Sequence, residues 1–163
     1  MSTVSLSLPF RGQYVVTQPY GVTSNTFELP GHGHALWHQG IDFATPCGTQ
    51  LYAAGDGAVY VDQPELYNND YGANLVTIDH GQGVTSLYGH LSQKTVATGQ
   101  IVKRGDPIGL SGGGMGNRSI DGNSTGCHLH FGVLLDGWHD QDLDLLTDRF
   151  RFWEDIPPHS MCV

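Results

Sequence analysis

The sequence predicts a mostly β domain, and two observations support this prediction. Glycine supplies 23 of the 163 residues, about twice the usual share, and recurs between short segments in which apolar and polar residues alternate. Before residue 139, no stretch repeats its apolar residues at the three- and four-residue spacing of a helix. Because glycine-rich turns between short alternating strands are typical of antiparallel pairing, we expect an antiparallel β-sheet.

The individual elements follow from local patterns. Alternation predicts strands at 57–61, 73–78, 83–88, 100–103, 106–110 and 128–134. A turn over 103–106 separates two of these strands. A short C-terminal helix is expected from 139 to 153, where Leu143, Leu146 and Phe150 recur at spacings of three and four residues, although the end of this segment also fits a strand.

Nothing in the sequence divides the chain into parts. It has no linker, internal repeat or low-complexity tract, so residues 1–163 are expected to form a single domain. Two segments, 63–71 and 112–126, are expected to be long loops. Loops of this length in a compact domain are often functional.

The charge balance excludes several classes of partner. The chain has 16 acidic and 7 basic residues, and no basic cluster exceeds Lys103-Arg104, so we exclude nucleic-acid binding. The same excess of negative charge opposes capture by anionic membranes or wall polymers, so such a target would have to be recognised by a shaped groove. No apolar run approaches the roughly 20 residues of a spanning helix, and we expect no membrane insertion.

The N-terminus and the cysteines give information about export of the protein and about its redox environment. The first residues lack the basic region and the unbroken apolar run of a signal peptide, which predicts indirect export or a leader that has been removed. Cys47, Cys127 and Cys162 form no CxxC pair, so a disulfide scaffold or a Cys-rich zinc finger is not indicated. We expect free thiols, with a Cys47–Cys127 bridge as the open alternative.

Nine histidines are the most informative feature of this charge-poor chain. In the predicted strand at 128–134, alternation places Leu129, Phe131 and Val133 on one face and His128 and His130 on the other. Two imidazoles opposite an apolar face suit a metal or proton-transfer site on a sheet. Two solvated surface histidines are the alternative.

The same rule applied to residues 86–91 places Leu87 and Leu91 toward the core and Tyr88 and His90 on the polar face. A third histidine is thereby predicted on a polar sheet face. Taken alone, His90 would more often be an ordinary hydrogen-bonded or surface histidine than a catalytic one.

A histidine and a carboxylate lie four residues apart in His38-Gln-Gly-Ile-Asp42. In an extended chain this spacing separates them by about 13 Å, too far for one ion whose ligands lie ~2 Å from it. Since Gly40 disfavours a helix, we expect a turn or bulge at Gly40, where glycine accepts a positive φ and both side chains swing toward one point.

Together these fragments supply two histidines and one carboxylate as candidate metal ligands. Two further histidines remain that need not bind the metal. A His, Asp, His set that leaves the fourth position to water is the pattern of catalytic zinc. Zinc lowers the pKa of its bound water to about 7 and polarises a neighbouring carbonyl. The expected reaction is hydrolysis of an amide.

The order of these motifs resembles a known family. The segments His38-Gln-Gly-Ile-Asp42, Tyr88-Gly-His90-Leu and Ser124-Thr-Gly-Cys-His128-Leu-His130-Phe, with the framework at 43–59, 76–83 and 99–109, resemble the lysostaphin/LytM-type zinc peptidoglycan endopeptidases. The resemblance runs from about Gln18 to Leu135. It implies a LytM/lysostaphin-like, duplicated-hybrid-type antiparallel β-sheet with a loop-walled substrate groove, in which an extended cell-wall peptide lies across the metal.

The resemblance also implies roles for five residues. His38, Asp42 and His130 would hold Zn²⁺. His90 and His128 would flank the attacking water and share proton transfer and charge stabilisation, with the identity of the base left open. The expected partner is a bacterial peptidoglycan peptide, and we expect a monomer.

The chain departs from the family in three places. Cys127 stands where the family usually has proline, so a thiol beside His128 could affect metal loading. An insertion at 113–123 makes Arg118 and Asp121 candidates for substrate contact together with Tyr88, the alternative being a solvated loop. The extension at 136–163 is expected to pack on the domain through its aromatic residues Phe150, Phe152 and Trp153.

The other histidines are predicted to have structural roles. His32 and His34 mimic the HxH motif but are expected in a loop or at the groove rim. His80 is predicted to lie in a turn, and His139 and His159 are predicted to lie on the surface.

Two other functions fit the same resemblance. They are a non-catalytic peptidoglycan-binding or amidase-regulating LytM-like module and a zinc hydrolase that trims small peptides. Since all five site residues are present, the endopeptidase is favoured. The lack of a leader and of a wall-binding module suggests a phage lysin or virion-associated enzyme, which reaches the wall by holin release or virion delivery. The bond that is cut stays open.

Overall fold

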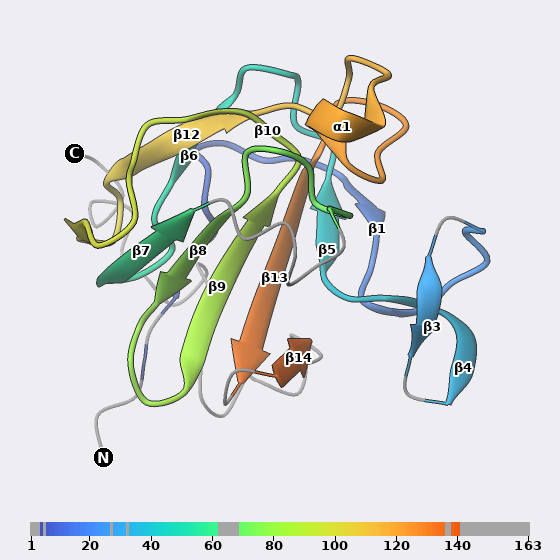
Figure 1. Cartoon of the computed structure of the whole chain (residues 1–163), viewed down its shortest axis with the longest axis horizontal. Coiled ribbons are helices and arrows are strands. Elements are labelled where there is room, and N and C mark those ends of the chain that lie inside the picture. Colours follow the sequence, from blue (N-terminus) through green and yellow to red (C-terminus); the bar gives the residue numbers. More distant parts are fainter. Residues whose placement is uncertain are drawn as a thin grey trace.

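The computed structural model of the chain describes residues 4, 6–26, 28–31, 33–61, 69–135 and 138–140. Within these residues the chain forms three antiparallel sheets and one short helix (Figure 1). The predicted mostly β, antiparallel fold class is confirmed. No helix in the described residues has the length and apolar character needed to cross a bilayer.

The largest sheet has the strand order β1-β5-β13-β9-β8-β7-β11, with β14 paired to β13. Its strands are β1 (Val16–Gln18), β5 (Ile41–Phe43), β7 (Gly57–Val61), β8 (Val76–Asp79), β9 (Val84–Gly89), β11 (Ile101–Val102), β13 (Leu129–Leu135) and β14 (Trp138–Asp140). The long pairing of β13 with β9 and the pairing of β13 with β5 bring together the segments that carry the candidate site.

Two smaller sheets complete the fold. Their strands are β10 (Leu91–Lys94), β12 (Pro107–Ser111) and β6 (Gln50–Tyr52) in one sheet, and β2 (Gly21–Val22), β4 (His34–His38) and β3 (Leu29–Gly31) in the other. Figure 1 shows β3 and β4 beside the large sheet, on the side of β1 and β5. The helix α1 (Arg118–Asp121) is a single turn within the predicted 112–126 loop.

The predicted strands are all present, with their ends displaced by a few residues. Most strands that alternation did not predict have two or three residues and are too short to show a period, whereas β4 and β10, with five and four residues, were missed despite their length. The single turn of α1 is likewise too short to repeat an apolar spacing.

The core lies between the large sheet and the β10-β12-β6 sheet. Leu129, Phe131 and Val133 on β13 are buried there, as alternation predicted. Ile108 of β12 and Leu51 of β6 meet them from the smaller sheet. Full burial of such a side chain stabilises the fold by about 1.5–3 kcal/mol, so this packing holds β13 firmly.

The predicted face of Tyr88 is wrong. Tyr88 is fully buried in the core opposite Phe131, and its hydroxyl accepts a hydrogen bond from the amide of Ala54 at 2.8 Å. Leu87, predicted toward the core, is buried, but on the other face of β9, beside Gly132 and outside the cluster that contains Tyr88. The prediction assumes that the strand and its alternation continue to His90. In the structure β9 ends at Gly89, so His90 does not share a strand face with Tyr88.

Several predictions concern residues that the structure does not describe. The extension at 141–163, with its aromatic residues, Cys162 and His159, lies outside the described residues, as do His32 and positions 63–68. Of the helix predicted at 139–153, residues 139 and 140 belong to β14, and the remainder lies outside the described residues.

Candidate metal centre

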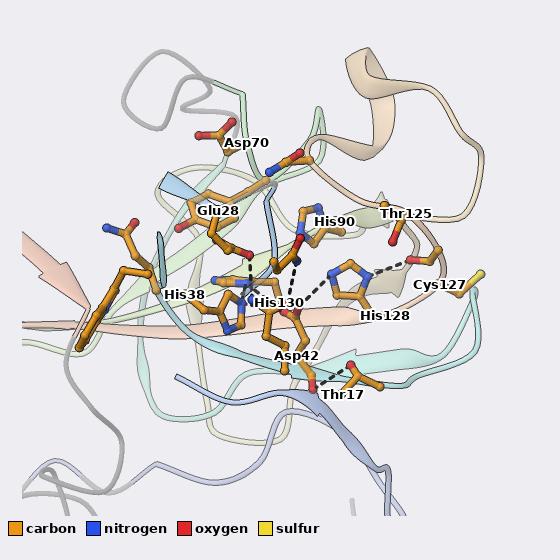
Figure 2. Close-up of a pocket in the computed structure, with 17 residues that line it drawn as sticks. Thr17, Glu28, His38, Asp42, Asp70, His90, Thr125, Cys127, His128 and His130 are labelled. Atoms are coloured by element: carbon orange, nitrogen blue, oxygen red, sulfur yellow. Dashed lines mark hydrogen bonds and ion pairs between the residues drawn. The ribbon is translucent and has the colours of Figure 1, made fainter. Parts of the chain in front are cut away.

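A pocket of about 310 Å³ opens over one end of the large sheet (Figure 2). Residues of β1, β4, β5 and β13 form its floor and one wall, and residues near 70 and from 123 to 128 form the other wall. His38, Asp42, His90, His128 and His130 all line it. The structure therefore brings together the five residues that the sequence singled out from three separate segments.

Three of these residues converge on one point. The register of β5 with β13 sets Asp42 directly opposite His130, and His38 ends β4 just before β5 begins. His38 Nε2 lies 3.1 Å from His130 Nδ1 and 3.2 Å from Asp42 Oδ1, and His130 Nδ1 lies 3.1 Å from Asp42 Oδ1. We refer to His38, Asp42 and His130 as the donor cluster.

Gly40 permits this convergence, though not through a positive φ as predicted. A Cβ at Gly40 would lie 2.5 Å from His130 Nε2 and 2.7 Å from the carbonyl oxygen of Phe131. Any side chain at Gly40 would therefore push into the His130 ring. Glycine is needed here for close approach and not for backbone conformation.

The protonation pattern of the donor cluster suits a cation. His38 Nδ1–H donates to the carbonyl of Pro19 at 2.9 Å, so the lone pair is on His38 Nε2 and points to the other donors. Burial by itself raises the pKa of Asp42, but the adjoining His130 and His38 rings outweigh it and hold that pKa far below its ordinary value. Burial lowers the pKa of His130, which keeps this ring neutral.

The three donor atoms lie within 4.8 Å of one another. Two imidazole nitrogens and one carboxylate oxygen are a donor set that zinc prefers, so the residues fit a zinc ion.

His90 and His128, which we call the histidine pair, lie beside the donor cluster with their rings 4.5 Å apart. His90 follows β9 with a φ of 61°, a left-handed conformation that returns its ring to the pocket side. Its Nδ1–H donates to the carbonyl of Asp121 at 2.6 Å, which leaves the lone pair on Nε2. Burial, aided by His128 and His130, lowers the pKa of His90 to about 3.

His128 is oriented in a similar way from the other side of the pocket. Its Nδ1–H donates to the carbonyl of Gly126 at 2.8 Å. Its Nε2 lies 3.7 Å from Asp42 Oδ2. Both members of the histidine pair therefore bind a backbone carbonyl through Nδ1 and keep Nε2 as the ring nitrogen with a lone pair.

A protein-family model described as Peptidase family M23 matches residues 37–142. The chain belongs to this family. Peptidoglycan DD-endopeptidase ShyB of Vibrio cholerae is 40% identical over 127 residues, which cover 76% of this chain and 27% of ShyB. Thus the chain spans only a small part of the length of this curated relative.

Solved M23 structures share the fold. The catalytic domain of lysostaphin from Staphylococcus simulans aligns with a TM-score of 0.63 at 27% identity, over 83% of this chain and 92% of that domain. The catalytic domain of the prophage-encoded M23 protein EnpA from Enterococcus faecalis, solved as a point mutant, aligns with a TM-score of 0.64 at 27% identity, over 85% of this chain and 95% of that domain. The resemblance to lysostaphin/LytM-type proteins is confirmed.

The structure places the residues predicted for substrate contact outside the pocket lining. The side chain of Asp121 is buried and accepts a hydrogen bond from the amide of Asn117 at 3.1 Å. Arg118 is outside the pocket lining and pairs with Asp70 at 3.2 Å. Tyr88, in the core, is also outside the lining.

Other groups line the pocket that sequence reasoning missed. Tyr71 stacks at a tilt on His130 with ring centroids 4.8 Å apart, and its carbonyl accepts the His90 amide at 2.7 Å. Glu28, on the opposite wall, accepts from Gln18 Nε2 at 3.0 Å. The carbonyls that orient the histidines have no sequence signal, because every residue carries one.

The expectation of free thiols is wrong for Cys47 and Cys127, which form a disulfide, the alternative that the sequence left open. The proposed effect of a Cys127 thiol on metal loading therefore does not apply to this form of the chain. His34, predicted in a loop or at the rim, lies in β4 and stacks on Trp37 with ring centroids 5.3 Å apart.

Proposed function

We propose that this chain is a zinc endopeptidase that hydrolyses amide bonds in the peptide cross-links or stems of bacterial peptidoglycan. The observation that carries the proposal is the convergence of His38 Nε2, Asp42 Oδ1 and His130 Nδ1 at the floor of the pocket, in an M23 chain that also places two further imidazoles beside them. Three Vibrio cholerae relatives are named peptidoglycan DD-endopeptidases, which supports this substrate class.

His38, Asp42 and His130 would hold the zinc ion. When bound, zinc supplies Lewis-acid polarisation of a carbonyl and lowers the pKa of a water to about 7. The ionised Asp42 contributes the negative charge of the set, and the Pro19 carbonyl fixes the His38 ring so that Nε2 faces the site. Such partners orient a metal ligand and fix its tautomer.

The histidine pair would handle protons. Each ring binds a backbone carbonyl through Nδ1–H and turns Nε2 to the pocket, where it can accept a proton from the attacking water or return one to the leaving amine. The carbonyls of Asp121 and Gly126 bind the Nδ1–H groups, which orients the rings and stabilises the imidazolium that forms. We assign proton transfer and charge stabilisation to the pair jointly.

Acidic groups on both walls set the charge of the pocket. Glu28 and Asp70 line it together with Asp42, and its lining contains no lysine or arginine within the described residues. An extended peptide would therefore be held through shape and hydrogen bonds. This agrees with a groove that recognises a wall peptide without relying on attraction to anionic wall polymers.

Digestion of purified sacculi by the zinc-loaded chain tests this function. Mass spectrometry should show cross-linked muropeptides converted to smaller products, with cleavage lost on chelation and recovered when zinc is added back. Asp42→Ala should bind no zinc and cleave nothing. Binding to sacculi without cleavage would instead indicate a non-catalytic module, and cleavage only of free peptides would indicate a small-peptide hydrolase.

The finer assignment to a phage lysin or virion-associated enzyme is also a proposal. It is supported by the likeness to EnpA, which is prophage-encoded. Co-expression with a holin in a susceptible host should produce lysis from within, whereas expression without the holin should not. Lysis that needs no holin would contradict this route.

A further inference from the structure

A disulfide beside the histidine pair has no part in the proposed chemistry. It joins Cys47, in the loop after β5, to Cys127, which directly precedes His128. The two cysteines are 80 residues apart in sequence, so the disulfide connects two segments that only the fold brings together. Figure 2 shows Cys127 next to His128 at the edge of the pocket.

The loop around Cys47 is fixed on the body of the domain. The amide and hydroxyl of Thr49 donate to the carbonyl of Pro46, at 3.1 and 2.7 Å, and close a turn around Cys47. The buried Ser111, at the end of β12, donates its hydroxyl to the same carbonyl at 2.8 Å, and its own carbonyl accepts the Gly48 amide at 2.8 Å. Cys47 is thus attached to a turn that several hydrogen bonds hold in place.

The hydrogen bonds that orient the His128 ring, by contrast, are local. Its Nδ1–H donates to the Gly126 carbonyl, and Ser124 Oγ lies 3.3 Å from the same nitrogen. Both partners belong to the segment 112–128 that also contains His128. They fix the ring within this segment, and the backbone bonds that attach the segment to residues 70–73, from the Ala73 amide to the Ile120 carbonyl and from the Asn123 amide to the Asp70 carbonyl, lie away from Cys127.

The 112–128 segment is shaped to accommodate the disulfide. A Cβ at Gly114 would lie 2.5 Å from Cys127 Sγ and 2.8 Å from Cys47 Sγ, so a larger residue would push against both sulfurs. The next residue, Met115, is 70% exposed at the tip of the loop. The disulfide is therefore a covalent contact between this loop and the β5 side of the pocket.

We propose that the Cys47–Cys127 disulfide is a positioning element for His128. By tying Cys127 to the fixed turn after β5, it keeps His128 Nε2 near Asp42 Oδ2, 3.7 Å away. Without the disulfide, residues 124–127 keep their local hydrogen bonds but lose the covalent link to this turn, so the His128 ring can shift relative to Asp42. This inference rests on the proposed function, which assigns proton transfer to His128.

The test compares kcat, KM and zinc content before and after reduction. Tris(2-carboxyethyl)phosphine converts the disulfide to two thiols and becomes the phosphine oxide, taking its oxygen from water. We expect two additional titratable thiols per chain and a fall in kcat of roughly 10- to 100-fold, because small displacements of a catalytic group are costly. KM and zinc content should not change.

Two variants provide matched controls. The double variant Cys47→Ser/Cys127→Ser should have the kcat of the reduced enzyme and should not respond to the phosphine, which controls for direct effects of the phosphine on zinc. Met115→Ala, at the exposed tip of the same loop, should keep the activity of the oxidised enzyme.

Amide hydrogen exchange separates positioning from general stabilisation. On reduction, exchange should increase in residues 112–128, while β5 and β13 stay protected. A reduced enzyme that keeps its full kcat would overturn the proposal, and so would increased exchange throughout the sheet. If the oxidised enzyme cleaves no peptidoglycan at all, the proposed function fails instead, and the exchange measurement still tests the role of the disulfide.

Discussion

The donor cluster and the histidine pair line one pocket, but different kinds of structure hold them in place. Asp42 and His130 face each other across the paired strands β5 and β13, and His38 ends the neighbouring strand β4. His90 and His128 lie just outside strands β9 and β13, and backbone carbonyls of the 112–128 segment fix their rings. The sheet therefore sets the geometry of one half of the site and a loop sets the other.

This difference predicts two ways in which a mutation can impair the enzyme. A change that disturbs the β5–β13 pairing should remove the metal, and with it all activity. A change in the 112–128 segment should leave the metal bound and slow the reaction.

Loss of a donor should have the largest effect. In His130→Ala the donor cluster keeps one imidazole and one carboxylate, so we expect no stoichiometric zinc. Activity should fall by more than the roughly 10⁴-fold that marks the upper range for loss of a general acid or base. Metal analysis of the dialysed protein measures the bound zinc, and digestion of sacculi measures the activity. Full zinc content in this variant would show that other residues hold the metal.

Removal of one member of the histidine pair should leave the metal in place. We expect His90→Ala and His128→Ala to bind one zinc per chain and to lose activity by roughly 10²- to 10⁴-fold, the range for a general acid or base. Steady-state kinetics with parallel metal analysis separate these variants from His130→Ala. Loss of zinc in either variant would contradict the separation of the donor cluster, which binds the metal, from the histidine pair, which does not.

Gly40→Ala tests the close approach on the sheet side. The added Cβ would meet the His130 ring and the Phe131 carbonyl, so the ring must move away from the donor cluster. We expect zinc affinity to fall by roughly 10- to 100-fold, as for loss of a partner that orients a ligand. Zinc titration measures it, and Ala35→Ser, exposed on β4, is the control that should bind normally. Unchanged affinity in Gly40→Ala would contradict this role.

The depressed pKa of His90 predicts a pH-dependent stability in the metal-free chain. Burial lowers this pKa from 6.5 to about 3, so between these values the unfolded chain binds a proton that the folded chain does not. Stability should therefore fall as the pH drops through this window, by about 1.4 kcal/mol per pH unit for each such proton. Urea unfolding between pH 6.5 and 4.5 should show a shallower slope for His90→Gln. Equal slopes in the wild type and in His90→Gln would show that His90 is not the group that makes stability depend on pH.

The smallest effect is expected at Asn117, the N-cap of α1. Asn117 accepts the Ser119 amide at 3.0 Å and begins the single turn of α1, whose Asp121 carbonyl binds His90. Loss of a cap costs about 1 kcal/mol, which corresponds to about a fivefold loss of kcat if the carbonyl loses its position. Asn117→Ala should show this loss with normal zinc content, and Ser119→Ala on the same turn should not. An unchanged kcat in Asn117→Ala would mean that α1 does not position His90.

The sequence predicted the sheet half of the site better than the loop half. Alternation placed Leu129, Phe131 and Val133 in the core, which correctly left His130 on the other face. Periodicity is informative there because β13 is long and packed on one side. Asp42 and His38 lie in short strands, so their convergence was expected from the chemistry of the ligands and from the family resemblance.

The loop half could not be derived from periodicity. His90 leaves the alternation of β9 through its left-handed backbone, which is why Tyr88 was placed on the wrong face. The carbonyls that hold the histidine pair come from Asp121 and Gly126, and a backbone acceptor carries no residue-type signal. The disulfide joins segments whose proximity depends on the whole fold, so cysteine spacing could not decide it.

X-ray absorption at the zinc edge of the loaded wild-type chain shows directly whether His38, Asp42 and His130 hold a zinc ion. We predict one zinc per chain with two imidazole ligands, one carboxylate and a further light-atom ligand, and a loss of bound zinc in Asp42→Ala. A sulfur ligand, a shell of four imidazoles, or a chain that binds no zinc would contradict it.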